Sequence, residues 1–354
     1  MPRFAVIIPN FNGKKILKAC LNSLERQTRR DFKIYVVDNG STDGSGSMVE
    51  KYFPRAKLIR LKKNTGFARA TNIGIRRAFS DYPGLKYICP LNNDVEVSPV
   101  YLQSLDRAAQ KYQNKKIKLG VLAAKLLFKK QPHRLNSAGT VIQIDGSGME
   151  RGFLEKDRAV FNRPASVFGS CAAACLYTAP MLKKISFKNK SGQTCYFDPD
   201  FFAYYEDLDL NYRSRLAGFK AYFAPKALAW HLHSATGQAF SPFKSFHVHR
   251  NQFYVLIKNF PWPFLIMGLA FMPVRYLMLF LSSLLGRGPS AKLKQKVKGP
   301  GLLKIVFSSW KDIIKNLPGL IEKRRFIQKN RVVNLGEFAG WFRKYPASFR
   351  KMIF

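Results

Sequence analysis

The first 130 residues alternate short apolar runs with stretches of helical periodicity, and few folds accept such an alternation. The runs that predict strands are 3–9, 32–38, 56–61 and 85–91. Those with helical spacing of apolar side chains are 14–27, 44–53, 66–79 and 98–112, the last with Ser98 as its expected N-cap. Strands that alternate with helices and are apolar throughout predict an α/β fold with a mostly parallel sheet covered on both faces.

Polar side chains gather where three of these strands end. The sequence reads "PNFNG" after the first strand, "DNGSTDGS" after the second and "NND" after the fourth. Ligands of such sheets bind beyond the carboxyl ends of the strands, so this edge is the expected site. Neither a GxGxxG nor a GxxxxGK[ST] loop is present, which argues against a dinucleotide enzyme and a P-loop ATPase.

Beyond residue 118 the pattern becomes irregular and strand-rich, and a helix is predicted within 201–225, closed by Gly218. The composition changes again near residue 240 and near residue 286. We therefore expect a domain at 1–240 with halves 1–117 and 118–240, an apolar helical segment at 241–286, and a basic helical tail at 287–354.

The chain carries 60 Lys and Arg against 21 Asp and Glu, a net charge of +39 that favours anionic partners. The basic residues are spread along the chain without an aromatic–basic recognition motif, so no nucleic-acid partner is expected. The five cysteines lie mostly in apolar runs and indicate reduced thiols in a cytosolic compartment. The apolar run 4–8 is too short for a signal peptide, and we expect the N-terminal part to face the cytosol.

Five motifs together resemble family 2 glycosyltransferases in their order and spacing, over residues 3–260. They are "AVIIPNFNG", "VVDNGSTDGS", "NTGFARATNIGI", "PLNNDVEV" and "YYEDLDLNYRSRLAGF". Within that family the chain looks like the bacterial rhamnosyltransferase-like branch of cell-surface polysaccharide synthesis. The resemblance implies a GT-A fold, a Rossmann-like sheet with a mixed acceptor-side subregion. It also implies inverting transfer of a sugar from a nucleoside diphosphate to a hydroxyl group.

The resemblance implies a nucleotide site at the strand ends. Asp38 would accept a hydrogen bond from the N3–H of uracil or thymine. The other residues implied as nucleotide-sugar contacts are Pro9, Asn10, Asn12, Asn64, Arg69, Asn72, Asn92 and Asn93. For Arg69 a solvated position on its helix is an equal alternative.

A divalent cation, Mg²⁺ or Mn²⁺, would offset the charge of the leaving diphosphate. By resemblance its ligands are Asp94 and His231. The family's common D-x-D pattern has Asn92 in place of its first Asp here, which removes one fixed negative charge. An exposed strand-end cap is the alternative for Asp94, and a bond to backbone or diphosphate is the alternative for His231.

By resemblance the catalytic base is Asp207, which would take the proton of the attacking hydroxyl. Glu206 beside it would contact the acceptor, because neighbours on a helix point about 100° apart. Asp209 is expected to be structural, with Arg213 as an i+4 partner. The alternative is a helix N-terminus that simply carries favourable acids. Arg250 would reach a phosphate of donor or acceptor.

Residues 262–287 are apolar enough to cross a bilayer, but Pro273 and Arg275 interrupt them. Nucleotide sugars are cytosolic, and the basic tail also favours the inner side, so a single crossing would separate the two. We expect a hairpin bent near Pro273 or a helix lying in the interface, with a buried helix and solvated tail as the alternative. The protein would then be monotopic or peripheral on the cytoplasmic face of the inner membrane, with an anionic membrane surface as a partner.

The expected donor is dTDP-rhamnose, with a UDP-hexose second, and the expected acceptor is a lipid-linked glycan. Two other interpretations stay open. One is a non-catalytic nucleotide-sugar-binding homologue, because Asn92 departs from the family pattern. The other is a polyprenyl-phosphate sugar synthase, although such enzymes usually lack the long insert seen between Asp94 and Glu206.

Overall fold

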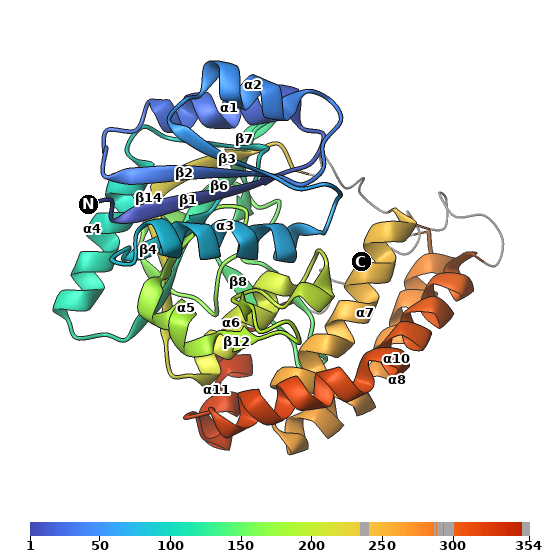
Figure 1. Cartoon of the computed structure of the whole chain (residues 1–354). Helices are drawn as coiled ribbons and strands as arrows, with labels where there is room; N and C mark the ends of the chain where they lie inside the picture. Colours follow the sequence, from blue (N-terminus) through green and yellow to red (C-terminus); the bar gives the residue numbers. More distant parts are fainter. Residues whose placement is uncertain (234–240, 287, 289–292, 294–300, 349–354) are drawn as a thin grey trace.

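The computed structural model describes residues 1–233, 241–286, 288, 293 and 301–348. Their strands form one large mixed sheet with helices on both faces, and a layer of helices lies beside it (Figure 1). The order in the sheet is β10 (Ala165–Ser166), β14 (Lys220–His231), β6 (Leu119–Phe128), β11 (Cys175–Thr178), β4 (Tyr87–Pro90), β1 (Phe4–Asn10), β2 (Phe32–Asp38) and β3 (Ala56–Arg60). Two further strands extend it, β5 (Val95–Val97) along β14 and β7 (Gln131–Ser137) along β6.

The sheet is parallel in its first half and mixed in its second. Strands β4, β1, β2 and β3 run parallel, and so do β6 and β14. Strand β11 runs antiparallel between β4 and β6 and joins the two halves. Two small hairpin sheets, β8 (Thr140–Ile142) with β9 (Gly148–Glu150) and β12 (Phe187–Lys188) with β13 (Thr194–Cys195), complete the strands of the described chain. The α/β expectation is thus confirmed, including its mixed subregion.

Alternate strand residues point to opposite faces, and each face has its own core. Val6 and Ile8 of β1 pack with α1 (Lys14–Glu25), α2 (Ser45–Tyr52) and α4 (Tyr101–Asn114). Ala5 and Ile7 pack with α3 (Phe67–Asp81), α5 (Ala179–Ile185) and α6 (Glu206–Leu216). Helix α4 begins later than expected, because the Ser98 carbonyl accepts a hydrogen bond from the Tyr101 N–H in a turn that precedes the helix.

A third core lies in the helical layer of α7 (Pro242–Asn259), α8 (Trp262–Leu284), α10 (Gly301–Lys329) and α11 (Leu335–Lys344). Two short 3₁₀ helices, η1 (Ala159–Asn162) and η2 (Pro199–Phe201), lie in the connections before it. Helix α11 returns to the sheet-containing part, where the Trp341 ring packs edge-on against Phe168. The division of the chain at residues 240 and 286 stays a prediction.

Helix α8 is continuous through Pro273 and Arg275, so the expected hairpin bent at these residues is not formed. Arg275, which interrupts the apolar run, faces the interior of the protein. Its guanidinium is buried and lies 2.7 Å from the Asp145 carboxylate. Among the described residues, α8 is the one helix long and apolar enough to cross a membrane by length and composition.

A buried ion-pair network joins α6 and α7 beneath the sheet edge. The Lys258 ammonium lies 2.5 Å from Asp198 and 2.7 Å from Asp209, and all three side chains are fully buried. Arg213 lies 2.8 Å from Asp209. The expected structural role of Asp209 and its pairing with Arg213 are confirmed. The network fixes the helix on which the predicted catalytic acids stand.

Candidate active site

The carboxyl ends of β1, β2 and β4 meet in a chain of buried polar side chains. Asn10 and Asp38 are register partners at the ends of β1 and β2. Asn93, in the turn after β4, donates from Nδ2 to Asn10 Oδ1 at 2.7 Å. Asn10 in turn donates to Ser45 Oγ at 2.9 Å. The strand ends that the sequence marked as polar therefore lie together at one edge of the sheet.

The loops after β1 and β2 hold each other in place. Asn12 adopts a positive φ of 49°, and its Oδ1 accepts from the Thr42 N–H at 2.8 Å. Asp38 Oδ1 accepts from the Ser41 N–H at 3.1 Å, and the Arg60 guanidinium lies 3.8 Å from its other oxygen. Pro9 precedes this edge within β1. The nucleotide contacts expected of these residues stay predictions, and the structure gathers the residues at one place.

Of the three residues expected to contact the nucleotide from α3 and the loop before it, two are exposed and one is buried. Asn64 is exposed, and its Oδ1 accepts from Asn39 Nδ2 at 3.0 Å. Arg69 is exposed on α3. Asn72 is buried and binds the backbone of 196–197 through both its amide oxygen and its amide nitrogen. In the structure Asn72 thus holds that segment against α3, and its nucleotide contact stays a prediction.

Asp94 and His231 lie side by side because β5 pairs antiparallel with the end of β14, with Val95 opposite His231. Asp94 Oδ1 and His231 Nε2 are 3.1 Å apart, and both side chains are largely buried. The other ring nitrogen of His231, Nδ1, is 2.9 Å from Oδ1 of Asn136 on β7. Sequence analysis missed Asn136, which lies in an irregular strand that carries no motif.

The chemistry of these side chains fits a divalent cation. Asn136 Oδ1 can only accept, so Nδ1 of His231 donates to it and the other ring nitrogen, Nε2, faces a carboxylate oxygen of Asp94. An imidazole nitrogen and a carboxylate oxygen are both ligands that a divalent cation such as Mn²⁺ takes. A ligating histidine usually donates its second nitrogen to an oxygen in this manner. In the part of the chain that the structure describes, no third His, Cys, Asp or Glu completes a metal group. The pair therefore fits an ion that takes its other ligands from diphosphate and water.

Two adjacent carboxyls begin helix α6 and differ in their surroundings. Asp207 accepts from the Leu208 N–H at 2.8 Å and from the Ala172 N–H at 3.1 Å. Glu206 is buried, and its Oε2 has no hydrogen-bond partner within the described residues. Burial raises the pKa of both carboxyls. The charge of Asp207 raises the pKa of Glu206 further, whereas the two N–H donors favour the ionised form of Asp207. Of the two, Asp207 therefore ionises more readily and is the one suited to accept a proton.

A third carboxyl, Glu150 on β9, belongs to the same group and was not identified from the sequence. Its Oε2 is hydrogen-bonded to Ser137 Oγ. Burial and then the charge of Asp207 raise the pKa of Glu150 to about 8. The only sequence signal was an acidic residue in a basic chain, without a motif around it. At neutral pH Glu150 keeps its proton and adds no charge beside Asp207.

One short segment links the two sides of the site. The Asn92 N–H donates to the Ala173 carbonyl at 2.9 Å, and the neighbouring Ala172 N–H donates to Asp207. The turn that carries Asp94 and the helix that carries Asp207 are therefore connected through 172–173. Both lie at the same edge of the sheet.

Arg250 on α7 is largely buried and ties the helical layer together. Its Nη1 is 3.0 Å from the Asp312 carboxylate, and its Nη2 donates to the Asp200 carbonyl at 2.8 Å. The phosphate contact expected of Arg250 stays a prediction, and in the structure these donors already have protein partners.

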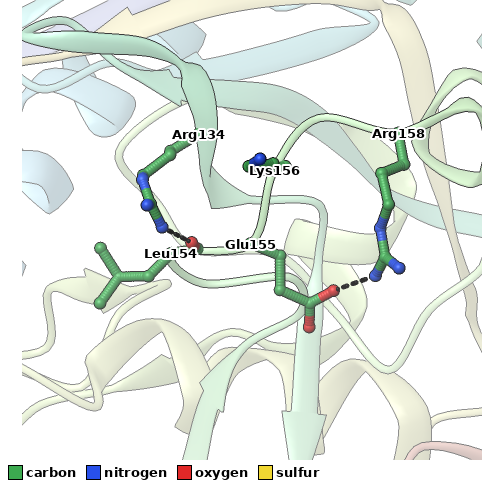
Figure 2. Close-up of a pocket in the computed structure, with 5 residues that line it drawn as sticks. All are labelled: Arg134, Leu154, Glu155, Lys156 and Arg158. Atoms are coloured by element: carbon green, nitrogen blue, oxygen red, sulfur yellow. Dashed lines mark hydrogen bonds and ion pairs between the residues drawn. The ribbon is translucent and has the colours of Figure 1, made fainter.

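A shallow, open pocket of about 530 Å³ lies where Arg134 of β7 meets the segment 154–158, and none of the predicted site residues lines it (Figure 2). Its lining is mostly basic and consists of Arg134, Leu154, Glu155, Lys156 and Arg158. Arg134 donates to the Leu154 carbonyl at 2.8 Å. The adjacent Phe153 ring packs against the ring of His233, two residues after His231.

Comparison with known sequences identifies the first half of the chain. The model of the family "Glycosyl transferase family 2" matches residues 5–185. The uncharacterized glycosyltransferase EpsJ of Bacillus subtilis is 33% identical over 115 residues, 32% of this chain and 32% of EpsJ. The teichoic acid poly(glycerol phosphate) polymerase of Staphylococcus epidermidis is 29% identical over 86 residues, 23% of this chain and 12% of that protein. The matched segments span a third or less of these curated relatives.

Solved structures share the fold over most of the chain. Residues 1–349 of S. aureus TarS superpose with a TM-score of 0.51 at 18% identity, covering 93% of this chain and 90% of that one. A mannosyltransferase from Pyrobaculum calidifontis, solved with GDP-Man and Mn²⁺, superposes with a TM-score of 0.51 at 17% identity, covering 89% and 87%. The fold is therefore GT-A, followed by a C-terminal helical region. Since the family model covers half of the chain, this protein belongs to glycosyltransferase family 2.

Proposed function

We propose that this protein is an inverting glycosyltransferase that moves a sugar from a nucleoside diphosphate to a hydroxyl group. The observation that carries the proposal is the shared edge, where the Asp94–His231 pair and Asp207 are connected through 172–173. Inverting transfer needs a charge-compensated diphosphate on one side of the sugar carbon. On the other side it needs one proton-accepting carboxylate.

Asp207 is the proposed base. The hydroxyl oxygen of the acceptor attacks the sugar carbon, the bond from that carbon to the diphosphate breaks, and the proton of the hydroxyl passes to Asp207. Its two N–H donors hold the carboxylate in one orientation, which favours a fixed line of attack. Burial and the charge of Asp207 raise the pKa of both Glu206 and Glu150, and in their protonated forms these carboxyls are suited to donate hydrogen bonds to acceptor oxygens.

On the donor side, Asp38, Asn10 and Asn93 line the strand ends where the nucleotide would bind. Asp94 and His231 would hold Mg²⁺ or Mn²⁺, which supplies charge compensation for the diphosphate. Two of the fold relatives were solved with Mn²⁺, the mannosyltransferase above and GalNAc-T7, which supports this proposal.

The proposed donor is dTDP-rhamnose, with a UDP-hexose as the second candidate. S. aureus TarS was solved with UDP-GlcNAc, which supports a pyrimidine nucleotide. The proposed acceptor is a lipid-linked glycan of cell-envelope synthesis. The name of the S. epidermidis relative, a teichoic acid polymerase, is in keeping with such a role.

A donor panel tests the proposal. The purified full chain is incubated with dTDP-, UDP- and GDP-sugars in Mn²⁺ or Mg²⁺, while release of nucleoside diphosphate and binding of each donor are measured. Consumption of one donor with multiple turnovers, by transfer to an acceptor in an added cell-envelope lipid extract or by hydrolysis with water as the acceptor, supports the proposal. Binding of a donor without consumption, with or without added membrane lipid, would show the non-catalytic alternative instead.

A further inference from the structure

Helix α8 exposes its apolar face and buries its one charged side chain, the opposite of an ordinary surface helix. The stripe that faces the protein contains Leu265, Gly268, Met272, Arg275 and Ser282, at helical spacing, and includes the helix's one charged side chain. The opposite face is exposed and apolar. Its large side chains are Trp262, Ile266, Met267, Leu269, Val274, Leu277, Phe280, Leu281 and Leu284, each at least 40% exposed.

Helix α8 lies along the domain and is fixed there. The buried Arg275–Asp145 pair joins it to the loop between β8 and β9. A Cβ at Gly268 would lie 2.7 Å from the Ile144 carbonyl, so the helix backbone touches the same loop. The Tyr276 hydroxyl is hydrogen-bonded to His249 of α7. A crossing helix would have to give up these contacts, including the buried ion pair.

Helix α10 adds a second apolar stripe with a basic flank. Its large exposed side chains at helical spacing are Leu303, Phe307, Trp310, Ile314, Leu317 and Ile321. Exposed Lys304, Lys311 and Lys315 each follow a residue of this stripe by one position and therefore lie about 100° from it around the helix axis. The two helices meet where the Arg324 guanidinium of α10 lies 4.3 Å from the centre of the Trp262 ring of α8. Both lie in the helical layer beside the sheet (Figure 1).

From this arrangement we propose that the outer stripes of α8 and α10 form a docking surface for an anionic membrane. Helix α8 lies in the plane of the interface instead of crossing it. We call the exposed apolar side chains of 262–285 and 303–326 the docking face. Nucleotide sugars are cytosolic, so the membrane surface concerned is the cytoplasmic one.

One observation marks the docking face as an interaction surface, and a second favours a membrane as the occupant over a second copy of the chain. The docking face holds 17 of the 25 large apolar side chains that are exposed among the described residues. Such a concentration marks an interaction surface. The sequence from 287 to 354 carries 17 Lys and Arg against three acidic residues. Two like surfaces with this charge repel each other, whereas an anionic leaflet attracts both.

The docking face also lies close to the acceptor side of the site. Asp145 lies in the loop between β8 and β9, and Gly148 begins β9, where an added Cβ would lie 2.9 Å from the side chain of Leu208, the residue after Asp207. The loop between β8 and β9, with the first residue of β9, thus connects α8 to the helix that carries the proposed base. This deepens the proposed function, on which it rests, because it places a lipid-linked acceptor beside Asp207.

Vesicle co-sedimentation of the full chain tests the docking face. The probes are vesicles of phosphatidylglycerol with phosphatidylcholine, and vesicles of phosphatidylcholine alone. Val274→Asp places a charge on the docking face, and Val160→Asp is its matched control, a valine of similar exposure in η1, away from the helical layer. We expect Val274→Asp to lower the partition coefficient about tenfold or more and Val160→Asp to leave it unchanged. Replacing Lys304, Lys311 and Lys315 by Glu should weaken binding to the anionic vesicles by at least about fivefold per residue.

Light scattering of the same protein samples measures their oligomeric state and so tests whether a second copy of the chain covers the docking face. A dimer that Val274→Asp dissociates, without vesicle binding by the unaltered chain, would overturn the membrane proposal in favour of self-association. Equal vesicle binding by Val274→Asp and the unaltered chain would overturn it as well. Donor binding and the hydrolysis of the donor by water need no vesicle, so a failure here is separate from a failure of the proposed function.

Discussion

Asp94 and His231 come from distant parts of the chain, yet Asp94 Oδ1 and His231 Nε2 lie 3.1 Å apart. The antiparallel pairing of β5 with β14 brings them together, with Val95 opposite His231. Asn136 fixes the other ring nitrogen at 2.9 Å. The pair stands at the carboxyl ends of the strands, next to the proposed diphosphate position, and the first two predictions follow from it.

Replacing His231 by Ala should weaken Mn²⁺-dependent binding of the nucleotide by about tenfold or more, because one of two protein ligands is lost. Calorimetric titration of UDP or dTDP with and without Mn²⁺ measures the effect. His133→Ala is the matched control, an exposed histidine outside the site. An unchanged metal dependence in His231→Ala would rule out the ligand role.

Asn92→Asp should strengthen metal-dependent nucleotide binding several-fold, because it adds a carboxylate where the family commonly has one. The same titration measures it. Asn22→Asp on the exposed side of α1 makes the same change of charge far from the site and should have no effect. Weaker binding in Asn92→Asp would show that its amide itself contacts the donor.

The raised pKa of Glu150 leads us to expect that the stability of the protein depends on pH. Its pKa is raised from 4.5 to about 8, so the folded protein holds a proton that the unfolded chain releases between these values. Stability should therefore fall as the pH rises from about 4.5 to 8 and then level off. Melting temperatures of Glu150→Gln, which has no such proton, should fall less over this range. Glu322→Gln, on the exposed side of α10, should follow the unaltered protein.

Lys258→Met should destabilise the protein by roughly 3–5 kcal/mol, because it leaves Asp198 and Asp209 buried without the cation they share. Lys57→Met breaks the exposed pair with Asp81 and should cost less than about 1 kcal/mol. Urea unfolding of both variants gives the comparison. Equal losses in the two would show that the buried network contributes no more than a surface pair.

The sequence allowed the gathering of polar side chains at one edge of the sheet to be predicted, because these residues follow strands whose ends must meet. Asn10, Asp38 and Asn93 each stand directly after an apolar run, and parallel pairing brings such positions to one edge. Glu206 and Asp207 could be predicted because they lie in a motif at the start of a helix. These predictions rest on local sequence patterns and needed no contact between segments that are distant in the sequence.

The remaining features depend on contacts between distant segments. Asn136 and Glu150 lie on short strands whose register is set by tertiary packing, without periodicity of their own. Arg275 was interpreted as a charge to be placed in a bilayer, because nothing in its own helix shows that Asp145 is its partner. Likewise, the packing of α11 on Phe168 depends on a helix returning from the end of the described chain.

The central claim is that Asp207 is the lone proton acceptor of the transfer. It is tested most directly with Asp207→Asn, by measuring in parallel donor affinity and the release of nucleoside diphosphate from the donor found in the panel. We predict turnover lower by about 10²–10⁴-fold with donor affinity unchanged. Turnover equal to that of the unaltered protein, or a loss of donor affinity that accounts for the fall, would contradict the claim.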